Sequence, residues 1–201
     1  MKKVVIVHCW SGYSQYCWYP ETKKALEAQG FAVQVPTMPE TAVPNLSLWL
    51  PKLQEVIGKP TEDTYLVGHS IGCITIMRYL ETLSEKQKIG GVVFVAGFTA
   101  NLDIREFTTF FEKPLDFFKI KTKIKHCVAI ASDDDPYVPP KYAEILKENL
   151  GAEVIIKHAM KHFSGEAGNC TSLPDVANAI FVMVSKSGCA LTQKSVYEDN
   201  I

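Results

Sequence analysis

The sequence predicts an α/β fold in which helices cover both faces of a parallel sheet, giving three layers. Short β-branched runs alternate with longer segments of helical period, which is the pattern of repeated βα units. The strand-like runs are almost continuously apolar, as strands that are buried on both faces require. The chain has 201 residues, enough for one domain with a full core but cramped for two.

Each element follows from its local pattern. Six strands are expected, at 3–8, 31–36, 64–68, 91–96, 126–131 and 153–158. Helices are expected at 20–29, 46–57, 72–85, 140–150 and 173–186. Gly30 and Gly151 follow two of these helices, where a helix end favours a left-handed residue. We therefore expect a single domain over 1–186 and a polar, frayed C-terminal tail over 187–201.

The segment 97–125 is the longest connection, and it holds six of the ten phenylalanines. One interpretation is a helix or two whose apolar face packs on the sheet. The alternative is that some of these rings also wall an apolar pocket above the strand ends, where open α/β sheets bind ligands. The candidate wall residues are Phe98, Phe110 and Phe111.

Composition excludes several classes of partner. Lysine plus arginine is 21 and aspartate plus glutamate is 22, so the net charge of −1 offers no field for a nucleic acid or an anionic membrane. No apolar stretch approaches the roughly 18 residues of a membrane span. Six cysteines form no Cys-x-x-Cys pair and are expected to be reduced, mostly buried thiols. We expect a cytoplasmic protein that acts on a small molecule.

The strongest local signal is Gly68-His69-Ser70-Ile71-Gly72, a Gly-x-Ser-x-Gly between a predicted strand and a predicted helix. In this context the turn is so tight that it strains the serine and exposes its hydroxyl, forming a nucleophile elbow. Gly68 and Gly72 remove the side chains that would clash there. A glycine-rich turn without catalysis is the alternative.

A serine nucleophile needs an imidazole to take its proton and a carboxylate to orient that imidazole. Both follow in the chain order serine, aspartate, histidine. Asp133, Asp134 and Asp135 come after the fifth strand, and His158 and His162 come at the end of the sixth strand and after it. Parallel strands place their carboxyl ends at one edge of the sheet, so these groups are expected to meet Ser70 there.

These motifs resemble the α/β-hydrolase superfamily, in particular its small cap-less serine hydrolases of the YdeN and retinoblastoma-binding-protein-nine type. The resemblance covers about residues 3–185 and includes Trp49-Leu50-Pro51, Met77-Arg78-Tyr79, the run at 132–139 and His162-Phe163. It implies Ser70 as nucleophile, Asp135 as the triad acid, His162 as the base and the strand order 2-1-3-4-5-6. It also implies a minimal hydrolase, because 201 residues leave no room for two further early strands or a cap domain.

Local stereochemistry agrees with Asp135, since Pro136 biases it toward an extended conformation at the strand exit. Asp133 and Asp134 are expected to be solvated loop carboxylates or charges at a helix N-terminus. Lys161 stands where relatives usually have glycine, which departs from the family pattern.

Two other roles for the histidines are less well supported by the sequence. His158 is an alternative base, and His158 with His162 is an i, i+4 pair that could chelate zinc on a helix. The segment between them lacks the glutamate of His-Glu-x-x-His and brings the positive charge of Lys161, so no metal is expected. His8 and His69 are expected to be structural.

The oxyanion of an acyl transfer needs backbone N–H donors. The expected donors are the amides of Ile71, directly after the nucleophile, and Trp10, in the turn 8–12 after the first strand. Cys9 in that turn is a rival nucleophile, but a buried thiol is the preferred interpretation. The chain has no phosphate loop and no Gly-x-Gly-x-x-Gly, so no cofactor is expected.

Together these observations predict a serine hydrolase that cleaves a small ester, thioester or activated amide through an acyl-enzyme on Ser70. The alternative is a protein-binding module with the same fold and an idle triad. The sequence indicates no protein partner, and Leu-x-Cys-x-Glu, the retinoblastoma-pocket ligand motif, is not present.

Overall fold

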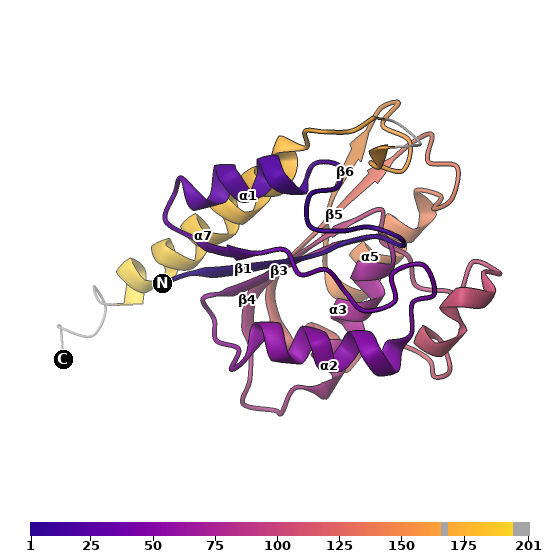
Figure 1. Ribbon diagram of the computed structural model, residues 1–201. Helices are drawn as coiled ribbons and strands as arrows, with labels where there is room; N and C mark the ends of the chain where they lie inside the picture. Colours follow the sequence, from indigo (N-terminus) through magenta and orange to yellow (C-terminus); the bar gives the residue numbers. More distant parts are fainter. Residues whose placement is uncertain (166–168, 195–201) are drawn as a thin grey trace.

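The computed structural model describes residues 1–165 and 169–194, with side chains described as far as Ser187. Its six strands form one sheet in the order β2-β1-β3-β4-β5-β6, and every neighbouring pair is parallel (Figure 1). The predicted sheet and strand order are therefore confirmed. The strands are β1 Lys3–Val7, β2 Ala32–Gln34, β3 Thr64–His69, β4 Ile89–Val95, β5 Ile124–Ser132 and β6 Glu153–Lys157.

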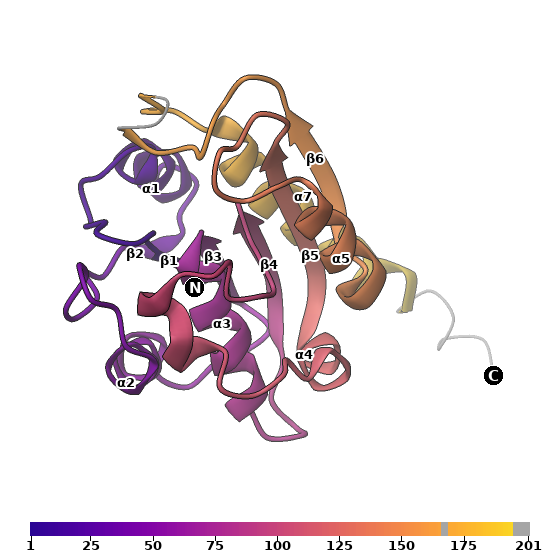
Figure 2. The same cartoon turned by 90° about the vertical axis from the view of Figure 1, so that its right-hand side faces the viewer.

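Helices cover the two faces of this sheet (Figures 1 and 2). α1 (Tyr19–Glu27) and α7 (Pro174–Lys194) pack on one face. On the other face lie α2 (Leu46–Ile57), α3 (Ile71–Thr82), α4 (Phe117–Lys123) and α5 (Lys141–Leu150). Two apolar cores result, one on each side of the sheet.

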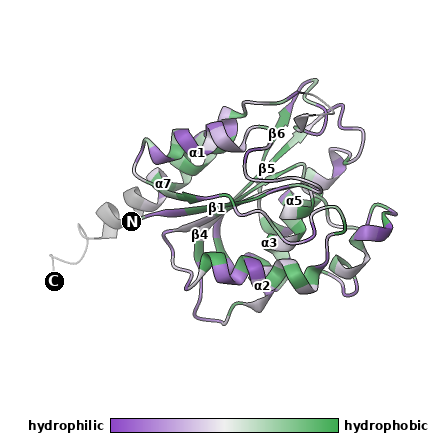
Figure 3. Ribbon diagram, in the orientation of Figure 1, coloured by the Kyte–Doolittle hydropathy of each residue, from purple (hydrophilic) through white to green (hydrophobic). Residues whose placement is uncertain are grey.

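β1 shows how the sequence builds both cores. Val4 and Ile6 point to the core under α1 and α7, whereas Val5 and Val7 point to the core under α2 and α3. All four side chains are completely buried, because successive residues of a strand face opposite sides. The central strands in Figure 3 are hydrophobic for the same reason.

The long connection 97–125 contains two short helices, a 3-10 helix at Arg105–Phe110 (η1) and α4. The buried Arg78 of α3 fastens this connection to the core. Its guanidinium donates to the carbonyl oxygens of Phe110 at 2.9 Å, Pro114 at 3.2 Å and Lys113, and its Nη1 pairs with Glu81 at 2.8 Å. The Met77-Arg78-Tyr79 motif thus places the segment that crosses above the strand ends.

The sequence pattern predicts the end of one helix correctly and places the end of another too early. α5 ends as predicted, with Gly151 in the left-handed conformation (φ 73°) and its N–H bonded to Lys147 O at 2.9 Å. α7 continues to Lys194, beyond the end predicted at 186, so the segment 187–194 of the predicted tail is helical. Hydrophobic periodicity fades after 186, but no proline follows to end the helix. Residues 195–201 lie outside the described part of the chain.

No helix among the described residues is long and apolar enough to cross a bilayer.

Candidate active site

Four loops at the carboxyl ends of the strands bring the predicted site residues together. Ser70 follows β3, Asp135 lies three residues after β5, and His162 lies five residues after β6. The turn 8–12 follows β1, which lies beside β3 in the sheet. This is the edge at which open parallel sheets place their ligands.

Ser70 has the strained backbone of a nucleophile elbow. Its φ of 55° and ψ of −120° lie in a region that residues with a side chain rarely adopt. The turn tolerates no Cβ on either side. A Cβ on Gly72 would lie 2.2 Å from Val7 O, and one on Gly68 would lie 2.7 Å from the backbone of Cys73. Both predicted elbow glycines are therefore required by backbone contacts.

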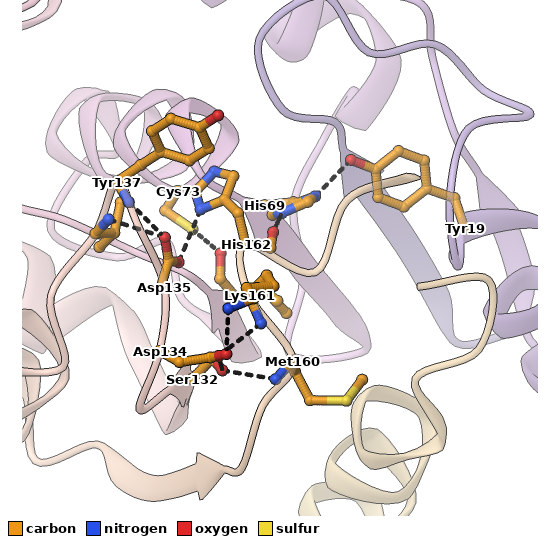
Figure 4. Close-up of polar contacts among 12 residues, drawn as sticks. Tyr19, His69, Cys73, Ser132, Asp134, Asp135, Tyr137, Met160, Lys161 and His162 are labelled. Atoms are coloured by element: carbon orange, nitrogen blue, oxygen red, sulfur yellow. Dashed lines mark hydrogen bonds and ion pairs between the residues drawn. The ribbon is translucent and has the colours of Figure 1, made fainter. Parts of the chain in front are cut away.

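His162 and Asp135 form a hydrogen-bonded pair that is almost fully buried. His162 Nδ1 lies 2.8 Å from Asp135 Oδ2, and the two side chains are 10% and 1% exposed (Figure 4). The other carboxylate oxygen, Oδ1, accepts from the N–H groups of Tyr137 at 2.9 Å and Val138 at 3.0 Å. Three bonds thus fix the carboxylate. Because an ionised carboxylate only accepts, Nδ1 carries the imidazole proton and Nε2 keeps its lone pair.

Ser70 and His162 line one pocket of about 380 Å³. The Ser70 side chain is nearly buried, and its Oγ makes no hydrogen bond to any residue within 1–165 and 169–194. Tyr137 packs against the His162 ring edge to face, with centroids 5.1 Å apart. Among the described residues, no lysine, arginine, aspartate or glutamate lines the pocket. It is a mostly apolar chamber that opens beside the elbow.

The predicted phenylalanine wall needs correction. Phe107, not Phe98, Phe110 or Phe111, lines the pocket, together with Leu102 and Ile104. Phe98 is fully buried behind Phe107, with ring centroids 5.6 Å apart, and Phe110 packs edge-on against Trp49 at 6.0 Å. The cluster of phenylalanines in 97–125 predicted an aromatic wall. Which ring faces the pocket depends on the path of the backbone through this segment, which the sequence pattern does not give.

Three amides of the turn after β1 are committed to hydrogen bonds within the protein. Cys9 N–H donates to Tyr19 Oη at 3.0 Å, Ser11 N–H to Thr41 O at 2.9 Å and Gly12 N–H to Cys9 O at 3.0 Å. In the described part of the chain no hydrogen bond uses the N–H of Trp10, which lines the pocket. Ile71 is the first residue of α3, so its N–H has no partner inside the helix.

Asp133 and Asp134 lie in an exposed loop, as expected, but they also form contacts that the sequence did not predict. Each of the three consecutive aspartates contacts a different part of the loop 158–162. Asp133 Oδ2 lies 2.6 Å from His158 Nδ1, and Asp134 Oδ2 lies 2.9 Å from Lys161 Nζ. Asp134 Oδ1 also accepts from the Lys161 N–H at 2.8 Å, and these bonds hold the pKa of Asp134 down at about 2. The positions of these aspartates in the sequence could not reveal these contacts, because the contacts depend on how the loop after β5 packs against the loop after β6.

This pairing also explains how the loop keeps an unusual backbone. Ala159, Lys161 and Phe163 all have positive φ, of 56°, 50° and 54°. Such residues persist only where their surroundings fix them. The segment 158–162 is therefore no helix, and the i, i+4 metal site that a helix would form is not built. No group of three or more potential metal ligands occurs among the described residues.

We expect Asp134→Ala to lower kcat/KM by about ten-fold, because the loop that carries His162 loses its anchors to Asp134 and small displacements of a reacting group are costly. Steady-state kinetics on an activated ester measures this. Lys161→Met is the matched control, since it removes only an exposed ion pair and keeps the backbone bond, and its kcat/KM should stay within about two-fold of wild type. Equal loss in both variants would contradict the role given to Asp134.

Cys9 lines the pocket, but its chemistry does not suit a nucleophile. Burial raises the pKa of its thiol to about 11, whereas reactive cysteines have a lowered pKa. The five cysteines whose side chains are described are all unpaired thiols, namely Cys9, Cys17, Cys73, Cys127 and Cys170. Cys189 lies outside the described side chains.

Comparison with known proteins agrees with this geometry. The serine hydrolase family matches residues 4–181. The chain belongs to the serine hydrolase family. Within it, the putative hydrolase YdeN of Bacillus subtilis is 34% identical over 186 residues, covering 92% of this chain and 97% of that protein. The serine hydrolase RBBP9 of Rattus norvegicus is 30% identical over 140 residues, covering 68% and 73%.

A solved structure of this type shows the same architecture. The crystal structure of the B. subtilis ydeN gene product superimposes with a TM-score of 0.87 at 33% identity, covering 92% of this chain and all of that one. This serine hydrolase is therefore a small α/β-hydrolase of the YdeN and RBBP9 type, as its motifs predicted.

A second hollow lies far from these residues, between α7 and the β5–β6 end of the sheet, with a volume of about 400 Å³. It is lined by Lys125, His126, Cys127, Glu153 and Lys186 among others. Among the described residues, His126 forms no ion pair with a carboxylate like that of His162 with Asp135. Although this second hollow is slightly larger, its lining does not include the strained Ser70 or the His162–Asp135 pair.

Proposed function

We propose that this hydrolase cleaves a small uncharged ester, thioester or activated amide through an acyl-enzyme on Ser70. The observation that carries the proposal is the convergence of the strained Ser70 elbow and the buried Asp135–His162 pair on one apolar pocket. The apolar side chains of Leu102, Ile104 and Phe107 on the pocket wall support an uncharged acyl group. Five free thiols support a reducing compartment such as the cytoplasm.

The reaction follows from the donors and acceptors present. His162 Nε2 takes the proton of Ser70 as Oγ bonds to the substrate carbonyl carbon, and the N–H groups of Ile71 and Trp10 hold the resulting oxyanion. His162 then gives the proton to the leaving group as its bond to carbon breaks. Water, deprotonated by the same nitrogen, releases the acid and restores Ser70. Catalytic hydrogen bonds are often long in unliganded sites, and the bond from Ser70 to His162 is formed in the complex.

A fluorophosphonate probe tests this proposal. We expect stoichiometric labelling of wild-type protein at Ser70 and none of Ser70→Ala, measured by intact mass and peptide mapping, because only an activated serine attacks the phosphorus centre. Ser11→Ala is the matched control, since Ser11 also lines the pocket without a base beside it, and it should label like wild type. Failure of the wild type to label would favour the alternative, a binding module with an idle triad.

A further inference from the structure

A buried chain of hydrogen bonds connects the turn after β1 to the backbone of His162. Cys9 N–H donates to Tyr19 Oη at 3.0 Å. Tyr19 Oη lies 2.7 Å from His69 Nδ1, and His69 Nε2 lies 2.8 Å from the carbonyl oxygen of His162 (Figure 4). The side chains of Tyr19 and His69 are completely buried. None of these contacts belongs to the proposed triad itself.

The chemistry of the groups permits one arrangement of protons. The carbonyl of His162 can only accept, so His69 Nε2 must carry a hydrogen. Burial lowers the pKa of His69 to about 3, so its ring is neutral and Nδ1 is an acceptor. Tyr19 must then donate its hydroxyl proton to Nδ1, which leaves its oxygen free to accept from Cys9 N–H. Every donor in this chain of hydrogen bonds therefore has an acceptor.

This chain of hydrogen bonds connects residues that the proposed reaction uses. His69 directly precedes Ser70, so one peptide bond and one hydrogen bond join the nucleophile to the backbone of the base. Within the described residues, this is the only hydrogen bond between the elbow 68–72 and the loop 158–165. The loop needs such an anchor, because Lys161 and Phe163, on either side of His162, both have positive φ.

At its other end, the chain contacts the turn that supplies Trp10. Tyr19 fixes the N–H of Cys9, the residue before Trp10, which lines the pocket. Asp133 and Asp134 hold the histidine loop from the exposed side, whereas His69 holds it from the buried side. The loop of His162 and the turn after β1 are thus both connected to the buried ring of His69, the loop directly and the turn through Tyr19.

We propose that His69 and Tyr19 are positioning residues, which set His162 and the turn after β1 in register with Ser70 for acyl transfer. This inference rests on the proposed function, and it assigns to the histidine of the elbow a role beyond filling the core. Neither side chain touches the substrate. Their effect is therefore expected in kcat, through the geometry of the reacting groups, and not in substrate binding.

The test compares kcat per active site, with active sites counted by stoichiometric fluorophosphonate labelling of Ser70. His69→Leu removes both hydrogen bonds of the ring, and we expect kcat to fall by about 30- to 100-fold with KM within about two-fold of wild type. His69→Gln retains an N–H donor for the His162 carbonyl and should recover most of that loss. Tyr19→Phe should lower kcat by about five- to twenty-fold.

Tyr79→Phe is the matched control for Tyr19→Phe. Tyr79 is also buried, but its hydroxyl has no partner among the described residues, so its removal should leave kcat unchanged. If His69→Leu and Tyr19→Phe lower the melting temperature while kcat per labelled serine stays at the wild-type value, the two residues are only structural and the inference is overturned. If wild type shows no turnover that depends on Ser70, the proposed function fails, and this inference falls with it.

Discussion

Asp135→Asn is expected to lower kcat by about 10⁴-fold while the protein stays folded. Asp135 accepts from His162 Nδ1 and from two backbone N–H groups. An asparagine amide can turn its N–H2 toward Nδ1, which selects the tautomer that carries the proton on Nε2. That nitrogen can then no longer take a proton from Ser70. Single-turnover kinetics with an activated ester measures the loss in the acylation step.

Asp133→Asn is the control for this variant, because it makes the same change two residues away. The asparagine loses the ion pair with the exposed His158 but can still accept from the Ala159 N–H, so the loop keeps this anchor and we expect kcat within about three-fold of wild type. Circular dichroism and melting temperature should show both variants folded. A larger loss in Asp133→Asn than in Asp135→Asn would mean that the carboxylate of the triad has been assigned to the wrong residue.

His162→Ala is expected to have the largest effect, a loss of about 10⁶-fold in kcat, because it removes the group that we propose takes and returns the proton. The residual rate comes from the oxyanion donors and from substrate binding. The same variant should react with a fluorophosphonate far more slowly than wild type. The rate of labelling under pseudo-first-order conditions checks this independently of the choice of ester.

His158→Ala distinguishes the two histidines of the same loop. The His158 side chain is 91% exposed, and its contact with Asp133 raises its pKa, which keeps it a surface ion pair and not a base facing the pocket. We expect its kcat to stay within about three-fold of wild type. Retention of full activity by His162→Ala, together with loss in His158→Ala, would reverse the assignment.

Much of the fold could be predicted from the sequence because its signals are local or follow from topology. The apolar runs of β1 and β4 require cover on both faces, and Gly151 marks a helix end that the structure has. The elbow was predictable because Gly68 and Gly72 are the residues its backbone contacts allow. Parallel strands have their carboxyl ends at one edge of the sheet, and Ser70, Asp135 and His162 each follow a strand. Their proximity could therefore be predicted.

The remainder depends on contacts between loops, which no periodicity encodes. Asp133 and Asp134 carry no local sign that they pair with residues 25 to 27 positions away. Phe107 differs from Phe98 and Phe110 only in the direction it faces, which Arg78 helps to set by fastening the connection. His69 could be predicted to be structural, but its bond to the backbone of His162 appears only once the two loops are packed together.

The most direct test of the account is the mass of the protein quenched in acid during turnover of an activated ester. We predict a transient adduct of one acyl group per chain, mapped to the peptide that contains Ser70, accumulating to a high level in a variant slowed in deacylation and absent from Ser70→Ala. An acyl group on Cys9, or turnover at the wild-type rate in Ser70→Ala, would contradict the assignment of Ser70 as the nucleophile.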